Sequence, residues 1–240
     1  MADTQPAPEP KKSDLGTRAA SAVVMVAVAG TALWLGGWWW TVFVAATAGI
    51  AFVEFVGLIR KIGVGKLGLV ASMIGGVGYI GAAAYSLVML HGDPVLYVVV
   101  TVIVTDTAAY FAGRSIGGPK IAPKISPSKT WSGLLGGMIA AGAWLSVAGV
   151  MGAYTMADQG PLSPEIQLGA LTWTGFKMFL IGSALAVAAQ AGDLFESWLK
   201  RRAGVKDSSN LIPGHGGVFD RIDGLLPVSI IFGLFAMAVQ

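Results

Sequence analysis

Long apolar runs separated by short polar segments dominate the chain. A helix needs about 20 apolar residues to cross the roughly 30 Å hydrocarbon core of a bilayer, and seven runs approach or exceed that length. They cover residues 19–36, 38–59, 67–90, 94–113, 133–155, 171–199 and 224–240. The last run is short, and the sixth continues past the bilayer. The pattern predicts an all-α integral membrane protein, a polytopic bundle of about seven transmembrane helices.

The positive charges predict how this bundle is oriented. All but Lys177 of the 16 Lys and Arg residues fall on the N-terminal tail or on alternate loops. Because an excess of Lys and Arg marks cytoplasmic segments, the N-terminus is expected in the cytoplasm and the protein in the cell (inner) membrane. The composition agrees, with 55% hydrophobic and only 12% charged residues, against about 25% charged residues in soluble domains.

The expected organisation is one domain behind a short tail. Residues 1–18 are polar and Pro-rich, which is typical of a disordered segment, and residues 19–240 form a single polytopic membrane domain. Acidic residues and the lack of a small-residue cleavage site argue against a cleaved signal peptide. The chain has no Cys and two His, so any metal is expected to be held by oxygen ligands.

Glycines recur inside the apolar runs. Gly76-Val-Gly78-Tyr-Ile-Gly81 matches a dinucleotide-binding pattern, but it lies within a span and lacks the preceding strand and the acidic ribose partner. Close helix packing through small residues is the favoured interpretation, and it applies equally to Gly133 and Gly137.

Four acidic residues lie within predicted spans, namely Glu54, Asp106, Asp193 and Glu196. Such groups are costly in hydrocarbon and should face the bundle interior or a water-filled cavity. Asp106 precedes Arg114, and Asp193 precedes Lys200, by similar intervals, which places both aspartates roughly 10–12 Å below the basic layer. They are expected to line one pocket. The alternative is that these acids only stabilise the bundle through interhelical hydrogen bonds, and for Glu54 the sequence favours neither role.

Polar groups continue from the sixth span into a basic loop. Asp193, Glu196, Ser197 and Lys200 share one helical face by their spacing, and the glycine-rich segment Pro213–Gly217 follows. Lys and Arg suit phosphate oxygens, carboxylates suit a hard divalent cation, and glycine-rich backbone can surround an anion. The combination predicts a nucleotide-phosphate site at a membrane surface. For the basic loop 114–132, simple contact with anionic lipid remains the alternative.

Two blocks carry a longer signature. The C-terminal block has Ser197, Lys200-Arg201, Lys206-Asp207, Pro213 to Gly217, Asp220-Arg221 and Asp223. The other runs from Asp106 to Arg114 and continues from Ser126 to Gly133. At every one of the C-terminal positions the sequence resembles the phosphatidate cytidylyltransferases, or CDP-diacylglycerol synthases. The resemblance covers about 106–223. Gly224 stands where the family usually has Ser, and Ser132 where it often has Glu.

The resemblance implies a reaction in which phosphatidate attacks the α-phosphorus of CTP, giving CDP-diacylglycerol and pyrophosphate for phospholipid synthesis. It implies Mg²⁺ as cofactor, with a second cation such as K⁺. The metal ligands it suggests are Asp193 and Asp220, then Asp223 and Asp106. The implied catalytic residues are Asp193, Asp220, Lys200, Lys206 and His215. The implied substrate-binding residues are Ser126, Lys129, Ser197, Arg201, Gly214, Gly216, Gly217 and Arg221.

Two alternatives stay open beside this interpretation. A related CTP-using membrane transferase with another lipid acceptor would share the phosphate site, and a small cation- or proton-coupled transporter would explain the intramembrane acids. Transport favours carboxylates near the midplane with access from both sides. The expected partners are CTP, phosphatidate and membrane lipids, with a homodimer as a candidate assembly and no nucleic acid. Asp220→Asn is expected to abolish turnover without unfolding the protein, since Asp220 lies in a predicted loop.

Overall fold

The computed structural model describes residues 15–90, 92–157 and 164–239. Residues 1–14 of the expected tail lie outside this range, and the helix that follows begins at Leu15, within the segment 1–18. The elements are α1 (Leu15–Leu35), α2 (Gly37–Ile62), α3 (Lys66–Met89), α4 (Asp93–Ser115), β1 (Lys120–Ala122), β2 (Ser126–Thr130), α5 (Trp131–Ala157), α6 (Pro164–Ala203), α7 (Phe219–Ile222) and α8 (Leu225–Val239).

Six helices of the described residues, α1 to α6, are long and apolar enough to cross a membrane. The chain is therefore a multi-pass, all-α membrane protein, as expected. The seventh expected span corresponds to α8, whose 15 residues rise only about 22 Å at 1.5 Å per residue. α6 has 40 residues and is about 60 Å long by the same rise, so it extends beyond the bilayer as predicted.

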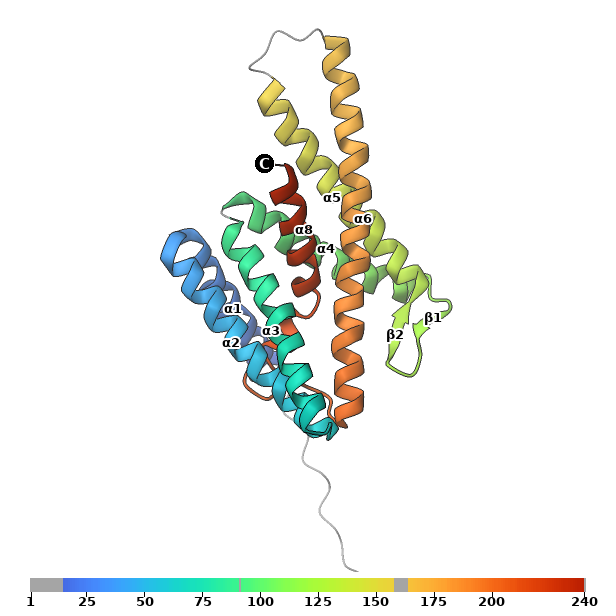
Figure 1. Cartoon of the computed structure of the whole chain (residues 1–240). Helices are drawn as coiled ribbons and strands as arrows, with labels where there is room; N and C mark the ends of the chain where they lie inside the picture. Colours follow the sequence, from blue (N-terminus) through green and yellow to red (C-terminus); the bar gives the residue numbers. More distant parts are fainter. Residues whose placement is uncertain (1–14, 91, 158–163, 240) are drawn as a thin grey trace, which may run out of the picture.

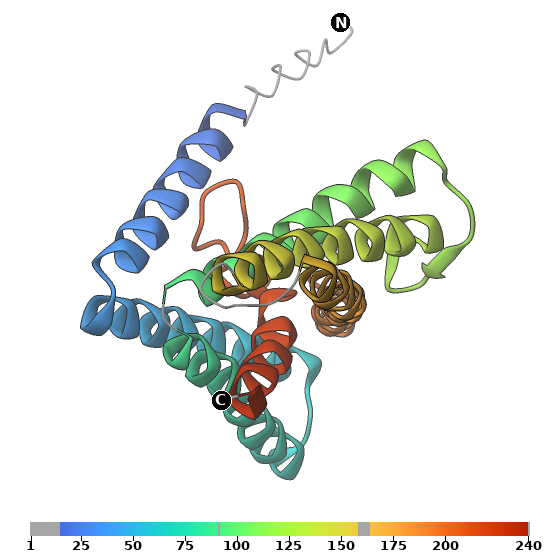
Figure 2. The same cartoon turned by 90° about the horizontal axis from the view of Figure 1, so that it is seen from above.

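The helices form two groups that meet at α6 and α8. α4, α5 and α6 pack together on one side, and α5 and α6 extend beyond the other helices (Figure 1). α2 and α3 form the other side with α8, and α1 lies at the outer edge against α2 (Figure 2). One buried cluster, including Val98, Leu145 and Leu185, joins the two groups. A second, including Phe55 and Phe219, lies under the segment that leads to α8.

Gly76, Gly133 and Gly137 serve helix packing, as the favoured interpretation predicted, whereas a Cβ at Gly78 or Gly81 would meet no atom within 4 Å. A Cβ at Gly76 would come within 2.6 Å of the Phe55 ring, so this glycine lets α3 approach α2. A Cβ at Gly133 would lie 2.8 Å from the Ala109 carbonyl oxygen, where α5 crosses α4.

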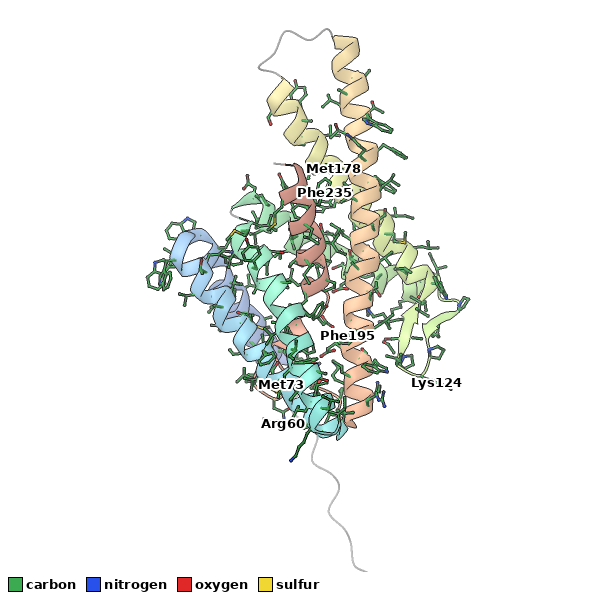
Figure 3. All side chains as sticks on the ribbon, in the orientation of Figure 1. Arg60, Met73, Lys124, Met178, Phe195 and Phe235 are labelled. Atoms are coloured by element: carbon green, nitrogen blue, oxygen red, sulfur yellow. The ribbon has the colours of Figure 1, made fainter. Side chains whose placement is uncertain are left out.

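A short antiparallel hairpin, β1–β2, lies between α4 and α5 where the sequence suggested only a loop. Lys120 pairs with Thr130 and Ala122 with Ser126. Prolines at 119, 123 and 127 interrupt the alternation that would have indicated strands. Lys124 lies at the tip of the hairpin and Arg60 at the end of α2, both toward the same end of the molecule (Figure 3). The hairpin therefore extends the basic end of the bundle.

Candidate active site

Three carboxylates gather around one lysine where α4, α6 and the start of α8 meet. The Nζ atom of Lys129, on β2, forms an ion pair with Asp193 of α6 and donates to Oε1 of Gln190 at 2.9 Å. Asp106, on α4, lines the same pocket of about 480 Å³. Asp106 and Asp193 thus share a pocket, as their equal depth predicted.

Asp223 completes this carboxylate cluster, defined as Asp106, Asp193 and Asp223. Burial first, and then the negative charges of Asp193 and Asp106, raise the pKa of Asp223 to about 7, against the opposing effects of the Gly224 N–H and Lys129. Gly224 N–H donates to Oδ1 of Asp223 at 2.8 Å. The cluster therefore holds more negative charge than its single lysine compensates.

The donor set of the carboxylate cluster suits a hard divalent cation. All three groups offer oxygen, the ligand that Mg²⁺ takes in proteins, and an added cation would relieve their mutual repulsion. Among the described residues, no three acidic or histidine groups are already gathered closely enough to hold an ion. Because Lys129 is paired with Asp193, we expect that a cation would require this pair to rearrange.

Basic and polar groups border the pocket beside the carboxylate cluster. Its lining includes Arg114 from the end of α4, and Lys120 and Ser128 from the hairpin. Nη1 of Arg114 donates to the Tyr110 hydroxyl at 2.6 Å. Ser126 begins β2 opposite Ala122, and Ser128 of the same strand lines the pocket. These groups form a cationic entrance suited to phosphate oxygens.

Asp220 belongs to a different network. Its Oδ1 accepts from Lys200 Nζ at 2.7 Å, and its Oδ2 accepts from the Ser208 hydroxyl at 2.8 Å and from the Ser208 and Gly217 N–H groups at 2.9 and 2.7 Å. Burial alone would raise the pKa of Asp220, but the adjoining Glu196–Lys200 pair and the hydrogen bonds from Lys200 and these backbone groups hold it well below its ordinary value. Lys200 also pairs with Glu196 at 2.5 Å.

Asp220 and Asp223, which the sequence grouped as metal ligands, have different charged partners in the structure. The charged neighbours that shift the pKa of Asp223 are Asp193, Asp106 and Lys129, whereas those of Asp220 are Glu196 and Lys200. Glu196 and Lys200 lie about one and two helical turns beyond Asp193 on α6. The N–H groups of Ser208 and Gly217 hold Asp220 toward its own loop, and this local bonding could not be inferred from spacing.

The predicted residues of α6 contact their neighbours as follows. Ser197 donates to Oδ1 of Asp193 at 3.3 Å, which confirms their shared helical face. Nε of Arg201 donates to the carbonyl oxygen of Ile125 at 3.2 Å. Arg201 thus ties the end of α6 to the hairpin.

The glycine-rich loop, residues 204–218, borders a second cationic pocket of about 480 Å³, here called the loop pocket. Its lining residues are Arg18, Lys206, Asp207, Asn210, Ile212, Pro213, Gly214, His215, Gly216 and Arg221. Within the described part of the chain, Nδ1 of His215 is buried without a hydrogen-bond partner. Gly217 differs from the expectation, because its N–H is already donated to Asp220 and is not free for a substrate phosphate.

An apolar groove of about 600 Å³ lies between α6 and the pair of helices α2 and α3. Phe195 of α6 extends toward α3, where its ring meets Tyr79 at 6.0 Å between centroids (Figure 3). At the basic end, the Arg202 guanidinium lies 5.3 Å from the centre of the Trp198 ring. An apolar wall with a cation at one end suits a lipid that carries a phosphate.

Sequence reasoning missed Gln190 and left the role of Glu54 open. Gln190 holds Lys129, and its signal was an amide in an apolar span one turn before Asp193. Glu54 was left between a structural and a functional role. Four donor groups of the glycine-rich loop and the start of α7 lie within hydrogen-bond distance of its carboxylate.

Comparisons with known proteins agree on one family. The profile of the cytidylyltransferase family matches residues 92–239. A phosphatidate cytidylyltransferase of Brucella suis biovar 1 is 42% identical over 166 residues, which are 67% of this chain and 55% of the relative. One of Pseudomonas aeruginosa is 36% identical over 233 residues, 90% of this chain and 75% of the relative. The chain thus spans 55% of the length of the Brucella protein.

Proposed function

Because the chain belongs to the cytidylyltransferase family, we propose that it transfers the cytidylyl group of CTP to phosphatidate. One observation carries the choice of a lipid acceptor. Consecutive residues of α6 border the apolar groove and the carboxylate cluster, since Gly192 lines the former and Asp193 the latter. The hydrocarbon and the phosphate of one lipid can therefore lie on adjoining faces of the same helix.

The proposed reaction forms one P–O bond and breaks another. A phosphate oxygen of phosphatidate attacks the α-phosphorus of CTP, and the bond to the β-phosphate breaks, so CDP-diacylglycerol and pyrophosphate leave. The reacting groups are all anionic, and catalysis needs positioning and charge neutralisation more than a protein nucleophile. Lys129, Lys120 and Arg114 supply positive charge at the pocket of the carboxylate cluster.

The loop pocket supplies the remaining contacts in this proposal. Lys206 and Arg221 bind phosphate oxygens of the triphosphate, and the His215 ring lines the same pocket. Asp220 and Lys200 hold the shape of this loop rather than touch the reacting atoms. Asp106, Asp193 and Asp223 would hold Mg²⁺, which supplies charge stabilisation at the phosphates.

The cationic ends of the helices support placing the site at the cytoplasmic face of the cell membrane. Lys129, Lys206 and Arg221 all fall on segments that the Lys and Arg distribution predicts to be cytoplasmic. CTP would then enter from the cytoplasm and phosphatidate from the bilayer.

Product formation in mixed micelles tests the proposal. Purified protein is incubated with CTP and phosphatidate, with and without Mg²⁺, and both CDP-diacylglycerol and pyrophosphate are measured. We expect both products in equal amounts, and none when either substrate or Mg²⁺ is omitted. CTP binding without product would replace phosphatidate by another lipid acceptor. Folded protein that neither binds CTP nor forms product would refute the cytidylyltransferase assignment.

A further inference from the structure

Glu54 is a buried carboxylate within a membrane span. It precedes Arg60 by six residues on α2, which places it roughly 9 Å below the basic end of that helix. Only 7% of the residue is exposed. Burial of a charge is costly unless protein groups satisfy it, so the partners of Glu54 indicate its role.

Among the described residues, the four donor groups within hydrogen-bond distance of Glu54 all come from one distant segment, residues 208–219. Oε1 accepts from the Ser209 hydroxyl at 2.6 Å and from Val218 N–H at 3.1 Å. Oε2 accepts from Phe219 N–H at 2.7 Å, and the Ser208 hydroxyl, which shares its one proton with Asp220, lies 3.2 Å away. Every partner is a donor, as an ionised carboxylate requires. Glu54 thus fastens a segment more than 150 residues away to α2.

The same segment contacts both α2 and Asp220. The Ser208 hydroxyl lies between the two carboxylates, 3.2 Å from Oε2 of Glu54 and 2.8 Å from Oδ2 of Asp220. A Cβ at Gly217 would lie 2.6 Å from both oxygens of Glu54, so the loop backbone lies directly against this carboxylate. Next to it, the Phe219 and Phe55 rings pack edge to face, 6.1 Å apart.

We propose that Glu54 is a positioning residue that fixes segment 208–219, so that His215 and Arg221 face the substrate phosphates. This inference rests on the proposed function, because it assigns the loop pocket to the triphosphate. Glu54 acts through Ser209, Val218 and Phe219. It lies outside the family match at residues 92–239, and that match assigns it no role.

Glu54→Gln tests the proposal, because it keeps the size of the side chain but places an NH₂ group against hydrogen-bond donors. Losing a hydrogen bond to a charged group should raise the KM for CTP by roughly tenfold or more. The KM for phosphatidate, as a mole fraction in the micelle, should stay unchanged, since the apolar groove is not held by Glu54. Thr47→Val is the matched control on α2, because its hydroxyl donates only within the helix, to Phe43.

Hydrogen exchange supplies a readout that does not depend on turnover. In Glu54→Gln one of the two acceptor oxygens becomes an NH₂ group, so either Val218 N–H or Phe219 N–H loses its acceptor, and we expect exchange in segment 208–219 to accelerate roughly tenfold or more. Segments of α4 and α5 should exchange as in the wild type. A merely structural role would instead lower the yield of folded protein and leave both KM values intact.

The outcomes separate this inference from the proposed function. Unchanged exchange in segment 208–219 refutes the role of Glu54 at any level of activity, and faster exchange with an unchanged KM for CTP refutes its link to the substrate. If wild-type protein forms no product, the proposed function fails, while exchange still decides whether Glu54 holds the loop. Should Glu54→Gln not fold, Ser209→Ala removes one donor and should accelerate exchange roughly fivefold; no acceleration would contradict the proposal.

Discussion

Replacing Asp220 with Asn should destabilise the protein as well as reduce its activity. The carboxylate accepts from Lys200 on one oxygen and from Ser208 and Gly217 on the other. An amide has only one acceptor oxygen, so its NH₂ group must face either the ammonium or the backbone donors. The sequence-based expectation of a folded variant rested on a loop position, whereas the structure buries the Asp220 side chain to 2% exposure and leaves Lys200 17% exposed.

The size of the effect follows from this burial. Removing one partner of a buried ion pair costs about 3–5 kcal/mol, but Lys200 keeps Glu196 at 2.5 Å, so the loss should approach that of one charged hydrogen bond. We expect about 2 kcal/mol, a change of roughly 30-fold in the unfolding equilibrium. Because the folded-state pKa of Asp220 lies below its ordinary value of 3.8, the stabilisation is present above about pH 4 and is lost as the pH falls further.

Unfolding of the purified protein in detergent, followed by tryptophan fluorescence at several pH values, measures this effect. Asp207→Asn is the control, since Asp207 is an exposed neighbour in the same loop and should change stability by less than about 0.5 kcal/mol. Combining Asp220→Asn with Lys200→Met should give a non-additive loss, because the residues are in contact. Wild-type stability in Asp220→Asn, or strict additivity in the double variant, would refute the network.

Three further predictions concern the carboxylate cluster and the packing beneath it. Because the pKa of Asp223 is raised to about 7, protons compete with Mg²⁺ for this carboxylate. The Mg²⁺ concentration for half-maximal product formation should therefore decrease as the pH is raised from about 6 to about 8. This pH dependence should disappear in Asp223→Asn, and its absence in the wild type would contradict the prediction. The same shift stabilises the fold at low pH, and this contribution is lost as the pH rises to about 7. Lys129→Met removes the partner of Asp193 and should raise the KM for CTP roughly tenfold. Lys124→Met, at the exposed hairpin tip, should leave this KM unchanged, and equal effects of the two substitutions would show that Lys129 does not bind CTP. In Gly192→Ala the new Cβ would collide with the backbone carbonyl oxygen of Asp223 and lie 2.9 Å from Pro227, which should cost about 1–3 kcal/mol in unfolding experiments. Gly169→Ala, with open space around it, should change stability by less than about 0.5 kcal/mol, and equal stability of the two variants would contradict this packing.

The sequence was most informative about features that the bilayer constrains, namely the length of the spans and the depth of the charged residues. Apolar run length indicated α1 to α6, and counting residues from the basic layer placed Asp106 and Asp193 at one pocket. Both arguments need only the rise of a helix and the thickness of a bilayer. They are reliable because polar side chains and unpaired backbone groups are energetically costly in hydrocarbon.

Spacing does not predict the direction of a side chain that local bonding determines. Asp220 and Asp223 are three residues apart, yet one faces Lys200 and the other the carboxylate cluster. The N–H groups of Ser208 and Gly217 orient the Asp220 side chain, and these hydrogen bonds cannot be predicted from the spacing of residues along the sequence. Glu54 was ambiguous for a related reason, since its partners lie more than 150 residues away.

The adjoining positions of Gly192 and Asp193 on α6 also determine which measure of lipid concentration sets the rate of the proposed reaction. If acyl chains stay in the groove while the phosphate reaches the carboxylates, the lipid never dissolves in water. Its encounter with the protein is then two-dimensional, and the relevant variable is the density of phosphatidate within the membrane leaflet. Diluting that leaflet with inert lipid would slow the reaction even at a constant total amount of substrate, whereas CTP would remain an ordinary solute.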